Sequence, residues 1–217
     1  AFKQQDFNKI SKLISYPLRR EYPIPSIKNE KECKLRFKQI FDDSLVKIIS
    51  HSKMKQWNEV GWRGIMLNNG TLWIDSYDGK IIAVNYQSEF EKKWLKQIIE
   101  TQRQSLHPSL KKFVRPVYKI VTENYRLRID EVVDNHYRYA SWKNGNTEST
   151  KPDIVLENGE LEMLGSGGNL VITFKSNNFT YLVYRNLIGA DNTPDITLEV
   201  QKDGNTILTE DGTLTEN

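Results

Sequence analysis

Apolar residues in the first half of the chain recur every three or four positions, which is the spacing of amphipathic helices. The pattern runs over residues 7–14, 33–49 and 90–99. Pro17 ends the first stretch, while Asn29 with Glu32 and Ser88 with Glu91 have the spacing of a capping box before the other two. We therefore expect three helices, the second of them unbroken from residue 30 to residue 49.

A short β segment lies between the second and third helical patterns. Apolar runs cover residues 65–67, 72–74 and 81–86, and Asn69-Gly70 and Asp78-Gly79 separate them. Asn-Gly and Asp-Gly accept the positive φ angles of tight hairpin turns. The first half of the chain is thus predicted to pack its helices on a small antiparallel sheet.

The second half changes to the period of two that is typical of strands. Tyr125, Leu127 and Ile129 alternate with charged residues, and Tyr137 and Tyr139 alternate in the same way. Further strands are expected at residues 154–156, 161–164, 170–174, 179–184 and 196–200, with turns at Asn144-Gly145, Asn158-Gly159, Asp203-Gly204 and Asp211-Gly212. Short strands at this spacing, with no helical window, predict an antiparallel sandwich or barrel.

These patterns predict an α+β protein with an α+β domain over residues 1–112 and an all-β domain over residues 113–217. Charge divides at the same place. Residues 1–112 hold 21 Lys and Arg against 12 Asp and Glu, a net +9, whereas residues 113–217 hold 10 against 16, a net −6. The split indicates two units with different surfaces. The basic residues of the first half are spaced as on a solvated helix face and no nucleic-acid-binding motif accompanies them, so we expect no nucleic-acid partner.

No catalytic or metal-binding motif is visible in the sequence. His51, His107 and His136 are too far apart to form a helical pair of metal ligands. Residues 165–169, Gly-Ser-Gly-Gly-Asn, lie between strands and do not open a helix, which indicates a wide hairpin or a bulge and not a phosphate loop. The single Cys33 lies on the apolar stripe of a helix, where a thiol is inert. We therefore predict no catalytic residue, no metal and no cofactor.

One loop offers oxygen donors that would suit a hard cation such as Ca²⁺. It holds Asp191, Asn192 and Asp195. The spacing is not that of an EF-hand, and Thr193-Pro194 is more simply explained as a turn, so a metal is not expected here either.

Aromatic residues are the remaining candidates for recognition. Trp and Tyr fill cores, and they also line sites for sugars, peptides or small apolar ligands. If the helices and sheet enclose a cavity, we predict that Trp62, Arg63, Trp73 and Tyr86 lie near it or at its rim. Arg63 could then bind a carboxylate while the rings supply contact area. The alternative is that Trp62 and Trp73 are closed core.

Short segments spread over most of the chain carry a resemblance. They are Ser15-Tyr16-Pro17-Leu18, Arg36-Phe37 to Ile40-Phe41-Asp42, Gly61-Trp62-Arg63-Gly64, Arg128-Ile129-Asp130, Tyr137-Arg138-Tyr139-Ala140-Ser141-Trp142, Lys151-Pro152-Asp153, Asn158-Gly159 and Gly165 to Asn169. They resemble segments of uncharacterised bacterial envelope proteins of the periplasmic or lipoprotein type. The order of elements in residues 5–104 is also similar to that of NTF2-like or cystatin-like domains. The resemblance implies export, and it implies no activity and no catalytic residue.

We accordingly expect an exported protein, periplasmic or associated with the outer envelope, that binds an unknown small molecule or protein without catalysis. No stretch approaches the roughly 18 apolar residues of a membrane span. A lipid anchor of the lipoprotein type would require a lipidated cysteine upstream of Ala1. One alternative is an envelope interaction module of the inhibitor or immunity type. Another is a small hydrolase or isomerase in the first domain's pocket. A deep aromatic concavity favours the first function, a flat apolar patch the second, and a perturbed carboxylate or histidine in a pocket the third.

Overall fold

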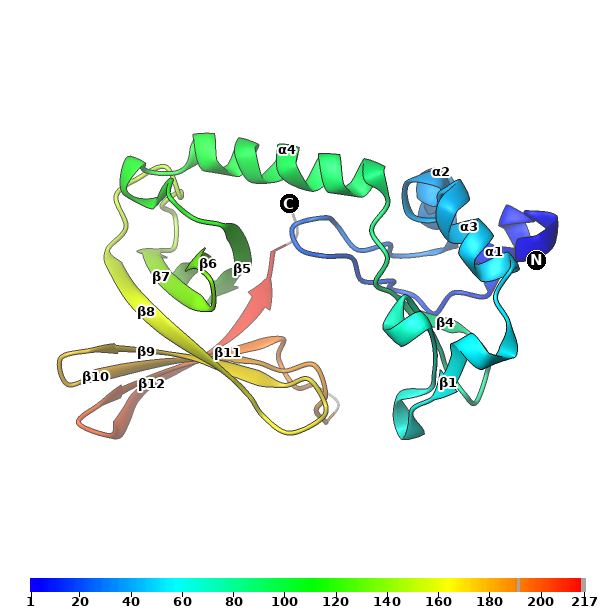
Figure 1. Ribbon diagram of the computed structural model, residues 1–217. Helices are drawn as coiled ribbons and strands as arrows, with labels where there is room; N and C mark the ends of the chain where they lie inside the picture. Colours follow the sequence, from blue (N-terminus) through cyan, green and yellow to red (C-terminus); the bar gives the residue numbers. More distant parts are fainter. Residues whose placement is uncertain (191, 216–217) are drawn as a thin grey trace. The chain divides into compact units, whose positions relative to one another are not determined.

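The computed structural model describes residues 1–190 and 192–215, and the chain forms two compact units, Ala1–Ile98 and Ile99–Asn217. The first unit holds helices and a small antiparallel sheet, and the second holds a closed antiparallel β-barrel (Figure 1). The predicted α+β class with an all-β part is therefore confirmed. The division between the units lies within helix α4 (Glu89–Ser105), upstream of the boundary expected at residue 112.

The first unit begins with helices α1 (Phe7–Lys12), α2 (Glu30–Ile40) and α3 (Asp43–Ser50), and its 3-10 turns are η1 (Phe2–Gln4), η2 (Met54–Gln56), η3 (Gly61–Arg63) and η4 (Asn68–Gly70). The side chains of Asp6, Asn29 and Asp42 cap the three helices, each accepting a hydrogen bond from a backbone N–H three residues on. The expectation of one unbroken helix over residues 30–49 is wrong. The backbone leaves the helical region at Phe41, and Asp42 caps a new helix there.

Helix α4 begins as the sequence predicts. The Ser88 hydroxyl oxygen accepts a hydrogen bond from the Glu91 backbone N–H at 3.1 Å. The helix ends before His107, whose Nδ1 accepts from the Ser109 N–H at 3.3 Å and caps the turn η5 (Pro108–Leu110).

The small sheet has the order β1 (Trp57–Glu59), β2 (Ile65–Leu67), β3 (Leu72–Ile74) and β4 (Ile81–Val84), all antiparallel. The last three strands were predicted, and β1 was not. Asn68, Asn69 and Gly70 all have positive φ and turn the chain between β2 and β3. The sheet is thus a meander of very short strands, which must bury one face to be stable.

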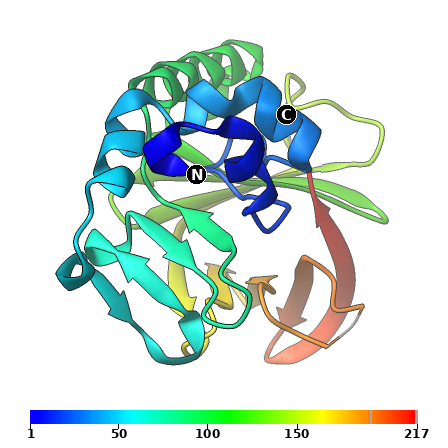
Figure 2. The same ribbon diagram turned by 90° about the vertical axis from the view of Figure 1, so that its right-hand side faces the viewer.

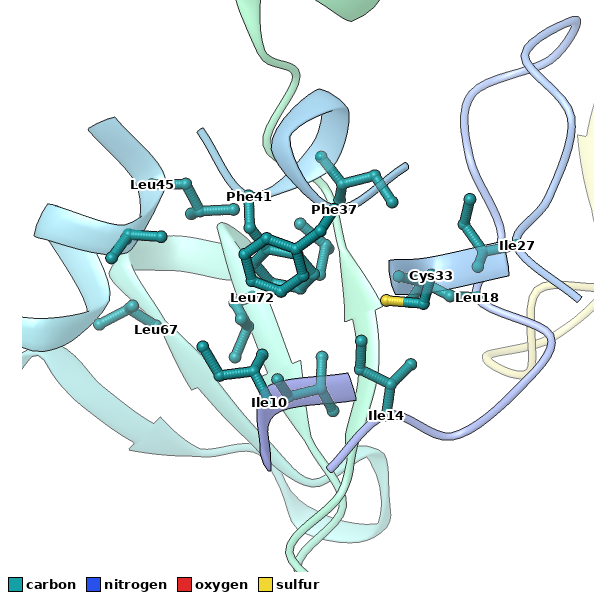
Figure 3. Packing of buried hydrophobic residues seen from close by; sticks show 14 residues of the cluster. Ile10, Ile14, Leu18, Ile27, Cys33, Phe37, Phe41, Leu45, Leu67 and Leu72 are labelled. Atoms are coloured by element: carbon teal, nitrogen blue, oxygen red, sulfur yellow. The ribbon is translucent and has the colours of Figure 1, made fainter. Parts of the chain in front are cut away.

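Helices α1, α2 and α3 cover that face (Figure 2). Phe37 of α2 and Phe41 stack at a centroid distance of 5.0 Å, and Leu67 and Leu72 of the sheet pack in the same cluster (Figure 3). Cys33 of α2 is fully buried among these residues, and burial raises the pKa of its thiol. The apolar stripe predicted for α2 is therefore the core of the first unit.

The second unit is an eight-stranded closed barrel in which each strand pairs with its sequence neighbours. Its strands are β5 (Arg115–Thr122), β6 (Tyr125–Val133), β7 (His136–Lys143), β8 (Ile154–Met163), β9 (Leu170–Ser176), β10 (Phe179–Arg185), β11 (Ile196–Lys202) and β12 (Asn205–Leu214). Pairing of residues 212–214 with residues 120–122 closes it. Of the two architectures left open by the sequence, the chain adopts the barrel.

Two dipeptides expected as turns, Asn158-Gly159 and Asp211-Gly212, lie inside β8 and β12 instead. A Cβ at Gly159 would lie 2.2 Å from the Phe174 ring, and one at Gly212 would lie 2.7 Å from a methyl of Ile120. These glycines therefore permit close packing rather than a reversal of the chain. Asn144-Gly145 and Asp203-Gly204 do connect strands, as predicted.

The alternation in β6 separates the inside of the barrel from its outside. Leu127 and Ile129 are fully buried in the interior cluster. Arg128 and Asp130 point outward yet are at most 1% exposed. A second apolar cluster, formed by Leu106, Leu110, Phe113, Ala140 and Trp142, covers the same outer region. The segment that precedes the barrel, which includes Leu106, Leu110 and Phe113, thus covers the charged face of β6.

Burial of Cys33 predicts slow thiol chemistry. We expect the native protein to react with Ellman's reagent far more slowly than the urea-unfolded protein, because the thiol is shielded and the thiolate is disfavoured. Reaction is followed by absorbance under both conditions. Equal rates would contradict the assignment of Cys33 to the core.

The cover over the barrel predicts different stabilities for two fragments. Residues 99–217 retain Leu106 and Leu110, whereas residues 113–217 lack both, and Trp142 is the sole tryptophan of either fragment. We expect the shorter fragment to be less stable to urea by about 3 kcal/mol or more, with red-shifted Trp142 emission. Identical unfolding curves and emission maxima would show that the segment contributes nothing to the barrel.

Candidate functional site

A cavity of about 680 Å³ lies in the first unit between residues 15–21 and residues 82–87. At one end, Ile81 of the edge strand β4 forms two backbone hydrogen bonds with the first segment. Its carbonyl accepts from the Ser15 N–H, and its N–H donates to the Leu13 carbonyl. At the other end, the side chain of Arg20 bridges to the strand in place of a backbone hydrogen bond. The two chain segments therefore separate after residue 81, and the space between them is the cavity, which we call the β4 groove.

Arg20 forms the closed end of the β4 groove. Its Nε donates to Glu91 Oε1 at 2.7 Å and its Nη2 lies 2.5 Å from Glu91 Oε2, so the pair is bidentate. The same guanidinium donates to the carbonyl of Val84 and, at 2.8 Å, to that of Tyr86. The Arg20 side chain is 2% exposed and that of Glu91 is fully buried. Each charge is therefore compensated, and Arg20 holds the loop, the strand and the first turn of α4 together.

The rest of the lining is mixed in character. Tyr16 donates its hydroxyl to the Ser11 carbonyl at 2.8 Å, and burial raises the pKa of that hydroxyl. Glu21 accepts a hydrogen bond from the Gln87 amide, and Arg19 is exposed. The peptide bonds before Pro17 and Pro23 are cis. The rim of the groove thus carries charged, amide and aromatic side chains. The charge of Arg20, which forms its wall, is already paired with that of Glu91.

The four predicted site residues are not gathered around this cavity. Trp62 and Arg63 lie together in turn η3, where Trp62 is 68% exposed. Trp73 of β3 is half-buried on the sheet face opposite Leu72, beside Met66 and Ala83 of the neighbouring strands. The structure therefore places these three on the side of the sheet away from the helices, or at its end.

Tyr86 bonds to Arg20, a residue of the lining, through its backbone only. Its carbonyl accepts from Arg20, but its side chain points to the core, where the hydroxyl donates to Asp42 Oδ2 at 3.0 Å. Burial and then the Asp42 carboxylate raise the pKa of Tyr86. Asp42 is thus both a helix cap and the acceptor for Tyr86.

Sequence reasoning missed the residues that build the groove. Arg20 and Glu91 are separated by 71 positions, and Glu91 already had a local explanation as part of a capping box. Asn85 and Gln87 follow a strand without any motif. Arg20 stands between Arg19 and Glu21, and Glu91 precedes Lys92, so no local pattern marked either charge as buried.

The described residues contain no group of three or more His, Cys, Asp and Glu side chains placed to hold a metal ion. Of the loop considered for Ca²⁺, Asp191 lies outside the described residues and Asp195 pairs with Arg185 at 3.2 Å. Residues 165–169 connect β8 and β9, so the predicted hairpin is confirmed.

Comparison of the chain with protein-family models, with curated proteins and with solved structures gave no match. A search of the described helices found none with the length and apolarity that a bilayer crossing requires.

The Arg20 contacts predict a strong stability effect. We expect Arg20→Met and Glu91→Gln each to lower the free energy of unfolding by about 3–5 kcal/mol, because each leaves a buried charged or polar partner uncompensated. Urea unfolding followed by circular dichroism measures this. Lys34→Met is the control, since it breaks the exposed Lys34–Glu30 pair and should cost at most about 1 kcal/mol. An Arg20→Met variant as stable as Lys34→Met would show that the pair does not hold the groove together.

Proposed function

We propose that the protein is an exported, non-catalytic binding protein and that the β4 groove takes a small polar ligand. Export rests on the resemblance to bacterial envelope proteins. The observation that supports binding is the groove with its wall fixed by Arg20: a cavity of about 680 Å³ falls within the usual range of ligand sites. A wall held by a bidentate buried pair loses little entropy when a ligand binds.

The chemistry of the lining indicates the class of ligand. Arg19, Glu21, Asn85 and Gln87 supply charges, donors and acceptors at the rim, and Tyr16 supplies an apolar surface. Such a lining suits a small molecule with both charged and hydrogen-bonding groups, such as an amino acid or a short peptide.

Binding is favoured over the alternative of a hydrolase or isomerase for a chemical reason. Catalysis of that kind uses a nucleophile next to a base, or an acid and a base facing the same substrate atom. The groove is lined by one carboxylate, Glu21, and it is already engaged by Gln87. The buried Glu91 is neutralised by Arg20 and does not face a second acid.

Two experiments test the proposal: a screen for ligands of the wild-type protein and a substitution that fills the groove with a side chain. We screen amino acids, dipeptides, sugars and nucleosides for a rise in melting temperature of the wild-type protein. A compound at about a hundred times its dissociation constant adds about 2.7 kcal/mol, which corresponds to roughly 5–10 °C. Ser15 is half-buried in the lining, so Ser15→Trp should abolish the rise.

Ser76→Trp is the matched control, because Ser76 is exposed in the turn after β3 and is not among the residues that line the groove. It should respond as the wild type does. Circular dichroism of both variants checks that they fold. A compound that stabilises Ser15→Trp as much as the control binds elsewhere, and that result would contradict the groove as the site.

A further inference from the structure

The edge of β4 that faces the β4 groove carries a backbone N–H without a partner. The Asn85 N–H donates to the Thr71 carbonyl at 3.0 Å, so it points to the side of β3. Successive N–H groups of an extended strand point to opposite sides, so the Val84 N–H points away from β3 and toward the groove, whose lining includes Val84. The Val84 carbonyl points the same way, since it accepts from Arg20. Among the described residues, none on that side accepts a hydrogen bond from the Val84 N–H.

An unpaired N–H in this position calls for an acceptor from outside the chain. Val84 is 3% exposed, so the groove is the route by which an acceptor reaches its N–H. Buried backbone N–H groups are almost always hydrogen-bonded, whether to protein, water or ligand. The carbonyls on the same edge, those of Val84 and Tyr86, already accept from Arg20. At this end of the groove a ligand is therefore recognised by the acceptor that it brings and not by a donor.

The lining also holds a cation that is free to bind. Two exposed charged side chains lie at the rim, Arg19 and Glu21. Glu21 is engaged by the Gln87 amide, whereas the Arg19 side chain forms no hydrogen bond or ion pair with any residue that the structure describes. The other arginine of the lining, Arg20, is already paired with Glu91. A ligand that meets Arg19 therefore gains most if its acceptor is negatively charged.

A carboxylate meets both demands. It is an acceptor without a donor, it is small enough for a groove of about 680 Å³, and its hydrogen bonds are stronger than those of a neutral carbonyl. The first unit holds 18 basic and 11 acidic side chains, a net +7, so its overall field also favours an anion. Capture of a carboxylate by backbone N–H groups is a recurring mode of peptide recognition.

We propose that the β4 groove anchors its ligand by a carboxylate, which accepts from the Val84 N–H and pairs with Arg19. This inference rests on the proposed function, since it names the chemical group that the binding site recognises. It keeps amino acids, peptides with a free carboxyl end and other small carboxylic acids as ligands, and it excludes sugars and nucleosides. The anchor differs from Arg63, the arginine expected from the sequence to bind a carboxylate, which lies in turn η3 outside the lining.

Nuclear magnetic resonance of the isotope-labelled protein tests the proposal at the atom concerned. N-acetylleucine and N-acetylleucinamide are the probes, because they differ only in a carboxylate against an amide. We expect N-acetylleucine to bind at least about tenfold more tightly and to move the Val84 amide signal downfield. The Asn85 amide signal is the internal reference, since that N–H is already bonded to Thr71 and should move little.

Two variants separate Arg19 from the overall charge of the first unit. Arg19→Gln should weaken the binding of N-acetylleucine about fivefold and leave that of N-acetylleucinamide unchanged. Arg63→Gln is the matched control, because it removes the same charge from an exposed arginine outside the lining and should bind both probes as the wild type does. Circular dichroism confirms that both exposed substitutions leave the fold intact.

Ser15→Trp distinguishes failure of this inference from failure of the proposed function. The inference is overturned if N-acetylleucine leaves the Val84 signal unmoved, if the amide binds as tightly as the acid, or if Arg19→Gln binds both probes as Arg63→Gln does. The proposed function survives these results if Ser15→Trp still abolishes the binding of some compound without a carboxylate. If no compound binds in a manner that Ser15→Trp abolishes, the inference and the proposed function both fail.

Discussion

Buried guanidinium groups hold neighbouring segments of the chain together in both units. A charged group removed from water costs several kcal/mol unless its hydrogen bonds and its charge are satisfied. Arg20 meets this demand with Glu91 and two carbonyls of the β4 edge. Because these partners come from the end of β4 and from the first turn of α4, Arg20 fixes the first unit at the point where its short strands alone would leave an open edge.

The same constraint acts on the outside of the barrel. Arg128 forms a bidentate pair with Asp130 and donates to Gln102 of α4 at 3.1 Å. Arg138 pairs with Asp130 at 2.7 Å and donates to the carbonyls of Leu110 and Lys112. The first turns of α4 are thus secured by Arg20 in one unit, and the last turn and the segment after it by Arg128 and Arg138 in the other. The helix is shared between two units because a buried arginine engages each of its ends.

Features that depend on local period were predictable from the sequence, and those that depend on distant partners were not. Alternation in residues 125–129 identified a strand with one apolar face, and it could not show that Arg128 on the other face is covered. The capping residues Asn29 and Ser88 were found because the backbone N–H groups that donate to them, those of Glu32 and Glu91, lie three positions away. Gly159 was interpreted as a turn because Phe174, which occupies the space beside it, lies on another strand. The candidate site followed the same rule: aromatic residues were visible, whereas the Arg20–Glu91 pair that shapes the groove joins two segments without any shared pattern.

Because β12 closes the barrel by pairing with β5, the barrel cannot form completely until β12 has been synthesised. Residues 120–122 have no partner on one side until residues 212–214 have been synthesised. During translation the first unit can therefore reach its final form while the second is still an open meander of hairpins with two unpaired edges, the condition in which β proteins are most prone to aggregate. The barrel thus keeps two unpaired edges from the emergence of its first hairpin until Leu214 has emerged.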